Sequence, residues 1–598
     1  MDGFHLRFCG CRSTAQCVIG EEQGSDALSQ KRATHPISCQ LCAQNGPYAN
    51  ASVGLMLCCV IIFMVVCASS ATSARDLVAN TAVYLQALRL TQDENTILLG
   101  RPIAATEILS KLYAANGYEL LWQDTENRDA LYREISRSAE DGLAPRDFHW
   151  PTFRELAVQS QTSTIDREIE AKFDIIVSDA LVRLGYQLLY GKVRPDKLDP
   201  DWNYSRPLFG QDPVNVILSA LKTNAIPQLF SQLRIKHPYY LALKSALRSH
   251  REIAASGGWR SLPTGPALRK GMSGKRVANL RYRLAESGDL GLGERSDPVL
   301  FDKSIENAAR RFQVRHGLDA DGIVGRKTLE ALNISVEARI EQIRVNMERA
   351  RWVLRDIGDD FIIVNIAGFY LRLIEDSNVR WQSSVIVGTP YRKTPVFTAP
   401  MRYLEFNPTW TVPPTIMLED ILPKVKSEPG YLQRNDFRLV NFQRQPVDMA
   451  AIDWKDVESG KFPYLIVQQP GPRNSLGLVK FMFPNEHAVY IHDTPNRGQF
   501  KSTSRTFSSG CIRVEKPFEL ADLLLSGRKD WQPDQVAKII ASKATTRINM
   551  PKSLPVLLLY WTVDPEPGGG VQFYPDIYNR DAKVLKALNS SHASVRKP

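Results

Sequence analysis

The sequence predicts a multidomain α+β protein made of a helical scaffold domain, a compact three-helix module and a mostly β domain. Three observations lead to this fold class. The chain has 598 residues, and chains of this length normally divide into several domains. Apolar residues recur at helical spacing up to about residue 256. After Phe361, short β-branched and aromatic runs alternate with Gly and Pro, which is typical of strands and turns.

The first 74 residues are set apart from the rest. Residues 1–52 are polar and irregular, and we expect a disordered extension or a start codon placed too far upstream. Cys39 and Cys42 have the spacing of half a zinc site, but no further ligands are well placed, so we expect no metal. Residues 53–68 are an uninterrupted apolar run followed by small residues, so 53–74 should be a signal peptide or a single membrane anchor.

Two helical units should follow. Residues 75–260 are expected to form a scaffold domain, because Ile175, Ile176, Ala180, Leu181 and Leu184 recur at helical spacing. Residues 265–334 should form a module of three helices. We expect Ser273 to cap the first helix, the second to run from about Asp302 to Gly317, and the third to start near Thr328. His316 could contact a ligand or simply help to end the second helix.

The β domain should occupy residues 359–564, after a helical connector over 335–358 and before a C-terminal tail over 565–598. Phe361–Ala367, Tyr370–Ile374, Trp381–Val387, Leu478–Phe483 and Ala488–His492 read as strands, and a helix should begin at Pro517. Residues 408–472 form a long insertion, with a short helix over Met417–Lys426 and a loop over Asn435–Pro446. Because long insertions are usually functional or disordered, we expect a lid ahead of the strand that carries His492.

The chemistry should centre on Cys511 and His492. Eight of the nine cysteines lie at or before Cys67, and Cys511 is the ninth. An unpaired thiol in an exported chain can oxidise or cross-link, so a cysteine kept beside Gly510 indicates that the sulfur is needed. A thiolate can attack an acyl carbon while an imidazole moves the proton. The backbone N–H groups of Gly510 and Cys511 could then stabilise the oxyanion.

These residues stand in a recognisable motif. The stretch H-D-T-P … R-x-F-S-S-G-C-I-R-V, over His492–Val514, resembles the signature of the L,D-transpeptidase catalytic domain, with Ser509 where the usual pattern has a His. That form is similar to the large, multidomain Gram-negative branch, as are Asn407–Pro414 and Tyr560–Thr562. The line R-R-F-Q-V-R-H-G-L-D-A-D-G-I-V-G-R-K-T-L, over 310–329, resembles a three-helix peptidoglycan-binding module.

The resemblance implies acyl transfer between peptidoglycan stem peptides through a Cys511 thioester, with release of D-Ala and formation of a 3→3 cross-link. It also implies a capping subdomain in the insertion. Water as acceptor would make the protein an L,D-carboxypeptidase, and a non-catalytic peptidoglycan-anchoring protein is a further alternative. A general cysteine endopeptidase fits less well, because no third orienting residue can be placed. We expect His492 to act as base and no cofactor to be needed. Candidate substrate-binding residues are Arg513, Arg505, Tyr490, Ser509 and Trp410.

The net charge of +11 fits attraction to anionic envelope polymers or lipid headgroups, and it also fits an ordinary surplus for solubility. No Lys/Arg run with interleaved aromatic residues indicates nucleic-acid binding. The resemblance implies donor and acceptor peptidoglycan stems as partners, a role in cell-wall organisation and cell shape, and a location in the periplasm or cell envelope. The inner membrane is a further partner if residues 53–74 remain as an anchor.

Overall fold

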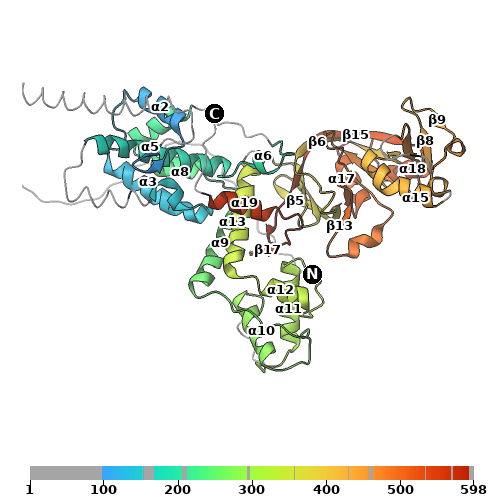
Figure 1. Cartoon of the computed structure of the whole chain (residues 1–598), viewed down its shortest axis with the longest axis horizontal. Coiled ribbons are helices and arrows are strands. Elements are labelled where there is room, and N and C mark those ends of the chain that lie inside the picture. The colour runs from blue at the N-terminus through green and yellow to red at the C-terminus, as the bar shows by residue number, and fades with distance from the viewer. Residues whose placement is uncertain are drawn as a thin grey trace, which may run out of the picture. The chain divides into compact units, whose positions relative to one another are not determined.

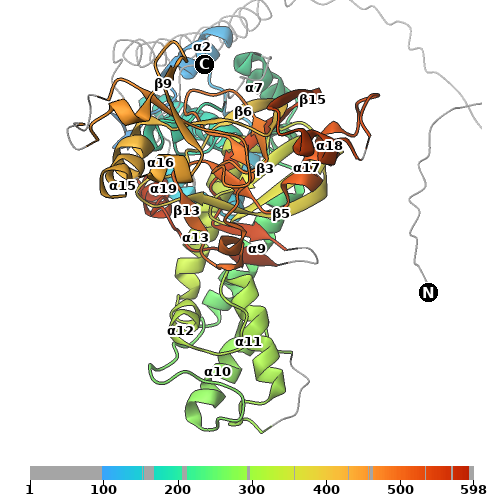
Figure 2. The ribbon, with the colours of Figure 1, turned by 90° about the vertical axis from the view of Figure 1, so that its right-hand side faces the viewer.

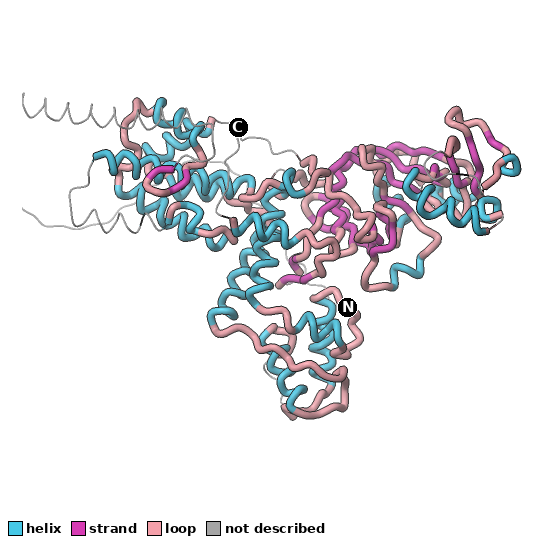
Figure 3. The backbone as a smooth tube through the Cα atoms, in the orientation of Figure 1, coloured by secondary structure: helices cyan, strands magenta, loops and turns pink. Residues whose placement is uncertain are grey.

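The computed structural model describes residues 97–150, 153, 167–204, 212–291, 297–355, 357–428, 430–454, 457, 462–532, 534–566 and 570–590. The predictions for residues 1–52 and 53–74 lie outside the described residues. The described part confirms the multidomain α+β class, because helices dominate before about residue 360 and strands dominate after it (Figure 3). None of the described helices combines the length and apolar character that crossing a membrane requires.

Most of the scaffold helices form a bundle around an apolar core that includes Leu109, Tyr113, Leu131 and Phe230 (Figure 1), whereas α9 packs in a second core with α13 (Val336–Val353). Local sequence explains where several helices begin. Asp212 accepts the Val214 N–H ahead of a Pro at the first helical position of α7, which is a favoured N-terminus. The scaffold elements are β1 Ile97–Leu98, β2 Arg101–Pro102, α2 Thr106–Ala115, α3 Thr125–Arg137, η1 Ser138–Asp141, η2 Pro145–Phe148, α5 Arg167–Tyr190, α6 Pro195–Leu198, α7 Pro213–Lys222, α8 Ile226–Leu233 and α9 Pro238–Ala255.

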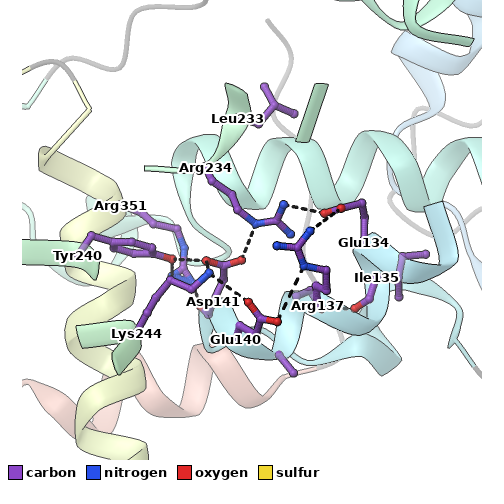
Figure 4. Close-up of polar contacts among 12 residues, drawn as sticks. Glu134, Ile135, Arg137, Glu140, Asp141, Leu233, Arg234, Tyr240, Lys244 and Arg351 are labelled. Atoms are coloured by element: carbon purple, nitrogen blue, oxygen red, sulfur yellow. Dashed lines mark hydrogen bonds and ion pairs between the residues drawn. The ribbon is translucent and has the colours of Figure 1, made fainter. Parts of the chain in front are cut away.

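A buried polar network joins four of these helical segments to the connector helix α13, Val336–Val353 (Figure 4). The carboxylate of Asp141 is fully buried and accepts hydrogen bonds from Arg234 at 2.9 Å and Tyr240 at 3.3 Å. Lys244 completes an ion pair with it at 3.0 Å. Its backbone carbonyl accepts from Arg351 of α13 at 2.8 Å. A buried carboxylate with this many donors holds the scaffold and α13 in one relative position.

The three-helix module has its own core, formed by residues such as Leu280, Leu284, Phe301 and Phe312. Its helices α10 Lys275–Glu286, α11 Lys303–Arg315 and α12 Arg326–Leu332 lie together in both views (Figures 1 and 2). Asp302 caps α11 by accepting the Ile305 N–H at 3.0 Å, and the helix begins near Asp302 as predicted.

The structure corrects the predicted N-cap of the first helix and decides between the two roles considered for His316. The N-cap of α10 is Gly274, at φ +129°, and not Ser273, because Ser273 is taken up in a bridge to Leu300. His316 is buried, donates from Nδ1 to the Phe312 carbonyl at 2.7 Å and stacks between Phe312 and Phe573. It therefore ends α11 and fixes the module against β17, and the ligand interpretation is wrong.

The β domain is built on a nine-stranded sheet of order β13-β5-β14-β12-β11-β6-β15-β3-β4, and an additional β4–β5 pairing closes the sheet on itself. One apolar core lies inside the sheet and includes α17. Its elements are β3 Phe361–Asn365, β4 Tyr370–Glu375, β5 Asn378–Gly388, β6 Thr398–Phe406, β11 Val479–Met482, β12 Ile491–His492, η5 Arg497–Lys501, β13 Thr506–Ser508, β14 Ile512–Val514, α17 Pro517–Leu525, α18 Gln535–Ser542 and β15 Thr546–Leu559.

Strand β3 is buried along its whole length because both of its faces are covered. Ile362 and Val364 lie in the core inside the sheet, whereas Phe361 and Ile363 lie in a second core with α9 and α13. A strand covered on both sides loses the alternation of a half-exposed strand. The segment predicted as a tail contributes to this second core through β17 Val571–Phe573, which pairs with β16 Val563–Pro565, and through α19 Asp581–Asn589.

The insertion folds as a small unit with its own sheet, of order β7-β10-β8-β9, and its own apolar core. The predicted short helix is present, but the predicted loop over Asn435–Pro446 is wrong, because β8 pairs with β10 there. The unit closes at its base, where the Asn474 side chain donates to the Pro408 carbonyl at 3.0 Å. Its elements are β7 Trp410–Thr411, α14 Pro414–Ile416, η3 Met417–Ile421, α15 Leu422–Ser427, α16 Tyr431–Arg434, β8 Phe437–Val440, β9 Pro446–Val447, η4 Met449–Ala451 and β10 Leu465–Gln468.

Candidate active site

Two neighbouring parallel strands, β12 and β14, position the central residues. His492 lies opposite Arg513, and the isoleucines that precede them lie opposite each other. Side chains alternate along a strand, so the two isoleucines point into the core and their neighbours point away from it. Tyr490 and Cys511 each lie two residues before this pair and share its face. The register alone therefore gathers Cys511, Tyr490, His492 and Arg513 on one side of the sheet.

The loop that carries Cys511 is held by hydrogen bonds on both sides of the thiol. Gly510 adopts φ +117°, which favours Gly, and its carbonyl accepts from the Thr394 hydroxyl at 2.8 Å. The Gly510 N–H donates to Ser508 Oγ at 3.2 Å, and that hydroxyl donates to the Cys511 carbonyl at 2.6 Å. The Cys511 thiol is half-buried and lies 3.8 Å from the Ala488 carbonyl. The Cys511 N–H has no hydrogen-bond partner among the described residues.

A backbone carbonyl orients the imidazole of His492. The ring is buried, and its Nδ1 lies 2.5 Å from the Asp493 carbonyl oxygen. Because a carbonyl only accepts, Nδ1 carries the proton of the neutral ring and Nε2 keeps its lone pair. The Leu476 carbonyl also interacts with the ring. The Asp493 carboxylate is engaged elsewhere, with the Leu478 N–H at 2.9 Å and Arg497 at 2.6 Å. The sequence could not indicate this orienting group, because every residue has a carbonyl.

The electrostatics favour a neutral pair. Burial first, and the Arg513 cation second, lower the pKa of His492 from 6.5 to about 3. Burial raises the pKa of the Cys511 thiol, although the backbone and hydroxyl of Tyr490 and the charge of Lys480 partly oppose the rise. Burial therefore favours an uncharged thiol and an uncharged imidazole over a preformed thiolate–imidazolium pair.

A cavity of about 630 Å³ lies between the nine-stranded sheet and the insertion. This volume falls in the range of small-molecule sites. Ala488 and Tyr490, which both interact with the Cys511 sulfur, belong to its wall. The sheet also contributes Glu405 and Lys480, and the insertion contributes Trp410, Met417, Phe442, Arg444, Phe462 and Tyr464, among others.

Arg392 connects the insertion to the Cys511 loop. From the segment after β5, its Nη1 donates to Ser509 Oγ at 2.9 Å. Its guanidinium also pairs with Glu419 and Asp420 in η3 of the insertion. Through Arg392, the insertion therefore contacts a residue two positions before Cys511. Sequence reasoning missed Arg392, because no local signal distinguishes it from a surface arginine.

The remaining predicted residues divide into two groups. Trp410 lines the cavity, and Arg513 lies on the face of the thiol with its Nη1 on Gln499 at 3.0 Å. Arg505 has another role. Its guanidinium donates to the backbone carbonyls of Val385, Ser502 and Phe369 at 3.0–3.2 Å, so it fixes the strand edge and does not face the cavity.

Comparisons with known proteins match three regions of the chain. Residues 107–247 match the model of a scaffold domain, 273–332 that of a "Putative peptidoglycan binding domain", and 359–537 that of the L,D-transpeptidase catalytic domain. A curated Haemophilus influenzae protein, "Putative L,D-transpeptidase", is 38% identical over 264 residues, which are 43% of this chain. The chain spans about half (53%) of that relative's length.

Two solved structures also match, at low similarity. An L,D-transpeptidase from Stackebrandtia nassauensis shares 13% identity over 50% of this chain and 96% of its own, with a TM-score of 0.19. One from Xylanimonas cellulosilytica shares 14% identity over 50% and 99%, with a TM-score of 0.15. Scores this low carry no argument, so the assignment rests on the domain models and the curated relative. The chain carries, in this order, a scaffold domain, a peptidoglycan-binding domain and a catalytic domain of the L,D-transpeptidase family.

Proposed function

We propose that this protein is an L,D-transpeptidase that joins peptidoglycan stem peptides by 3→3 cross-links, with Cys511 as nucleophile. The observation that supports this proposal most strongly is the place of the Cys511 thiol. It lies on the face of the sheet that carries His492, against two wall residues of a 630 Å³ cavity. An anchoring protein without catalysis would need neither the half-buried thiol nor the oriented imidazole.

The first step is formation of a thioester. His492 Nε2 takes the thiol proton as Cys511 Sγ attacks the carbonyl carbon between the third stem residue and terminal D-Ala. The Cys511 N–H is available for the resulting oxyanion, and the Gly510 N–H becomes available if it leaves Ser508 Oγ. The C–N bond breaks, and the imidazolium returns its proton to the departing amine of D-Ala. The lowered pKa of His492 favours return of this proton to the amine and makes its transfer from the thiol uphill until attack on the carbonyl begins.

The second step returns the enzyme to its resting state. The side-chain amine of diaminopimelate on an acceptor stem attacks the thioester carbonyl and passes a proton to His492. The C–S bond breaks, the cross-link forms, and the proton returns to Cys511. Water in place of the amine would give L,D-carboxypeptidase activity. We infer that the insertion acts as a lid that excludes water and so favours the amine; its contribution to the cavity wall and its Arg392 connection support this role.

The location follows from the substrate. We propose that the protein acts in the periplasm or cell envelope, and that the peptidoglycan-binding module keeps it at the wall. Residues 53–74 would direct export, whether cleaved or retained as an anchor to the inner membrane. The activity would contribute to cell-wall organisation and cell shape.

The test is direct. The purified protein is incubated with a disaccharide-tetrapeptide, and the products are followed by mass spectrometry. We expect release of D-Ala, an acyl adduct on Cys511 and a 3→3 dimer. Cys511→Ala serves as the matched control, since Ala fills nearly the same volume. Dimer formation by Cys511→Ala, or the absence of any adduct on the wild-type protein, would exclude the proposal.

A further inference from the structure

Lys480 occupies an unusual position in the cavity. In β11 it lies opposite His492 on one side and opposite Glu405 of β6 on the other. Because paired residues share a face of the sheet, Lys480 points to the side that carries Cys511, and it belongs to the cavity wall. Its Nζ lies 4.3 Å from the ring centroid of Tyr490. Within the described part of the chain, this ammonium makes no hydrogen bond and no ion pair within 4.0 Å.

A partly buried ammonium without an acidic contact is costly. Burial lowers the pKa of Lys480, while the charge of Glu405 opposes the shift, as does a Cys511 thiolate once it has formed. The aromatic face of Tyr490 compensates only part of the lost hydration. Such a cation gains most from an anion that enters the cavity with its own hydrogen-bond acceptors. Lys480 is thus suited to hold a ligand carboxylate.

The anion must lie close to the reacting atoms. Tyr490 interacts through its hydroxyl with the Cys511 sulfur and through its ring with Lys480, so one side chain separates the cation from the nucleophile. In the donor stem, the carboxylate of terminal D-Ala is three covalent bonds from the carbonyl carbon that Sγ attacks. The other carboxylates of the stem are farther away along the chain.

We propose that Lys480 binds the terminal carboxylate of the departing D-Ala and thereby selects donor stems that end in a free carboxylate at the fourth position. This inference rests on the proposed function. Lys480 is a positioning and specificity residue here. It places the scissile carbonyl over Cys511, whereas the proton transfers belong to His492. Glu405, across the strand, keeps the ammonium protonated and is not itself a ligand of the anion.

The cavity offers a matched control. Arg444 also lines it, but it stands on the exposed side of the insertion and donates to the Thr411 hydroxyl at 3.3 Å. Arg444→Met therefore removes one positive charge from the same cavity without touching the catalytic sheet. Lys480→Met and Lys480→Gln remove the charge at the proposed position, and Lys480→Arg keeps it.

The experiment compares two donors on the full chain: a stem tetrapeptide that ends in D-Ala and the same peptide that ends in D-alaninamide. The measured quantity is kcat/KM for release of the terminal residue. A charged hydrogen bond supports a preference of about tenfold or more for the carboxylate. We expect the wild type, Arg444→Met and, in part, Lys480→Arg to show this preference. Lys480→Met and Lys480→Gln should lose it, through slower turnover of the carboxylate donor alone.

The possible failures are distinct. An equal fall with both donors in the Lys480 variants would mean that Lys480 acts on Tyr490 or Cys511, and would overturn the assignment. A wild type without preference, or a preference that survives in both Lys480→Met and Lys480→Gln, would do the same. A wild type that forms no adduct with either donor would overturn the proposed function and the assignment of Lys480 together.

Discussion

The neutral state of the Cys511–His492 pair leads to a quantitative prediction. The pKa of His492 falls from 6.5 to about 3, chiefly through burial and then through the Arg513 charge. Since one pKa unit corresponds to about 1.4 kcal/mol, the imidazolium is about 5 kcal/mol less stable here than in free histidine. The acylation rate requires the uncharged ring, so kcat/KM should stay level as the pH falls from 7 to about 5.

Two measurements check this expectation. The first is kcat/KM for acylation by a small acyl donor between pH 4.5 and 8. The second is thiolate absorbance at 240 nm, taken as the difference between the wild type and Cys511→Ala so that the early cysteines cancel. We expect no acid limb near 6.5, and no thiolate signal from Cys511 at pH 6–7. Arg513→Gln removes a cation and should move the acid limb upward.

Contrary results would be clear. An acid limb near pH 6.5 would show that burial does not suppress the imidazolium. A full thiolate signal at pH 6 would show a preformed ion pair. The stability of the fold limits the pH range of this measurement. The His492 ring stays neutral in the native protein, whereas in the unfolded chain it takes up a proton below about pH 6.5. This histidine therefore contributes less stability as the pH falls from about 6.5 toward 3.

Three further predictions concern the elements around the site. Arg392→Gln should leave acylation by a small donor within a few-fold and should lower the ratio of transfer to hydrolysis, as measured by product mass spectrometry. An unchanged ratio of transfer to hydrolysis would show that the Arg392 contact does not contribute to the function of the lid. Residues 409–473 can be replaced by a short Gly/Ser linker, because Asn474 contacts the Pro408 carbonyl and the two ends of the insertion are therefore close. This deletion variant should still be acylated but should favour hydrolysis over transfer. A well-folded deletion variant with a normal ratio of transfer to hydrolysis would rule out the lid. Asp141→Ala should lower the free energy of unfolding by about 2 kcal/mol, because the partly buried Arg234 and Lys244 lose their charged partner; urea denaturation measures this, and a change below 1 kcal/mol would contradict it.

Much of the architecture could be read from the sequence, because the signals are local. Helical spacing indicates the module between Leu268 and Asn333, and its second helix begins directly after Asp302, close to the predicted start. β-branched runs mark the strands β3, β4 and β5. The loop prediction over 435–446 failed, because β8 is short and its apolar residues are covered only by the fold of the insertion. The burial of charged residues in α13 could not be predicted from the sequence either. This helix is covered on several sides, and a single apolar stripe in the sequence does not reveal such packing.

The sequence alone also indicated the two central residues of the candidate site, His492 and Cys511, through one motif and the distribution of cysteines. Tertiary structure decided the rest. Lys480 and Glu405 are 75 positions apart, and only the pairing of β11 with β6 places them side by side. The orienting group of His492 is a backbone carbonyl, which no residue type reveals. Strand register and main-chain geometry depend on the whole sheet, so these parts of the chemistry appear only when the chain is folded.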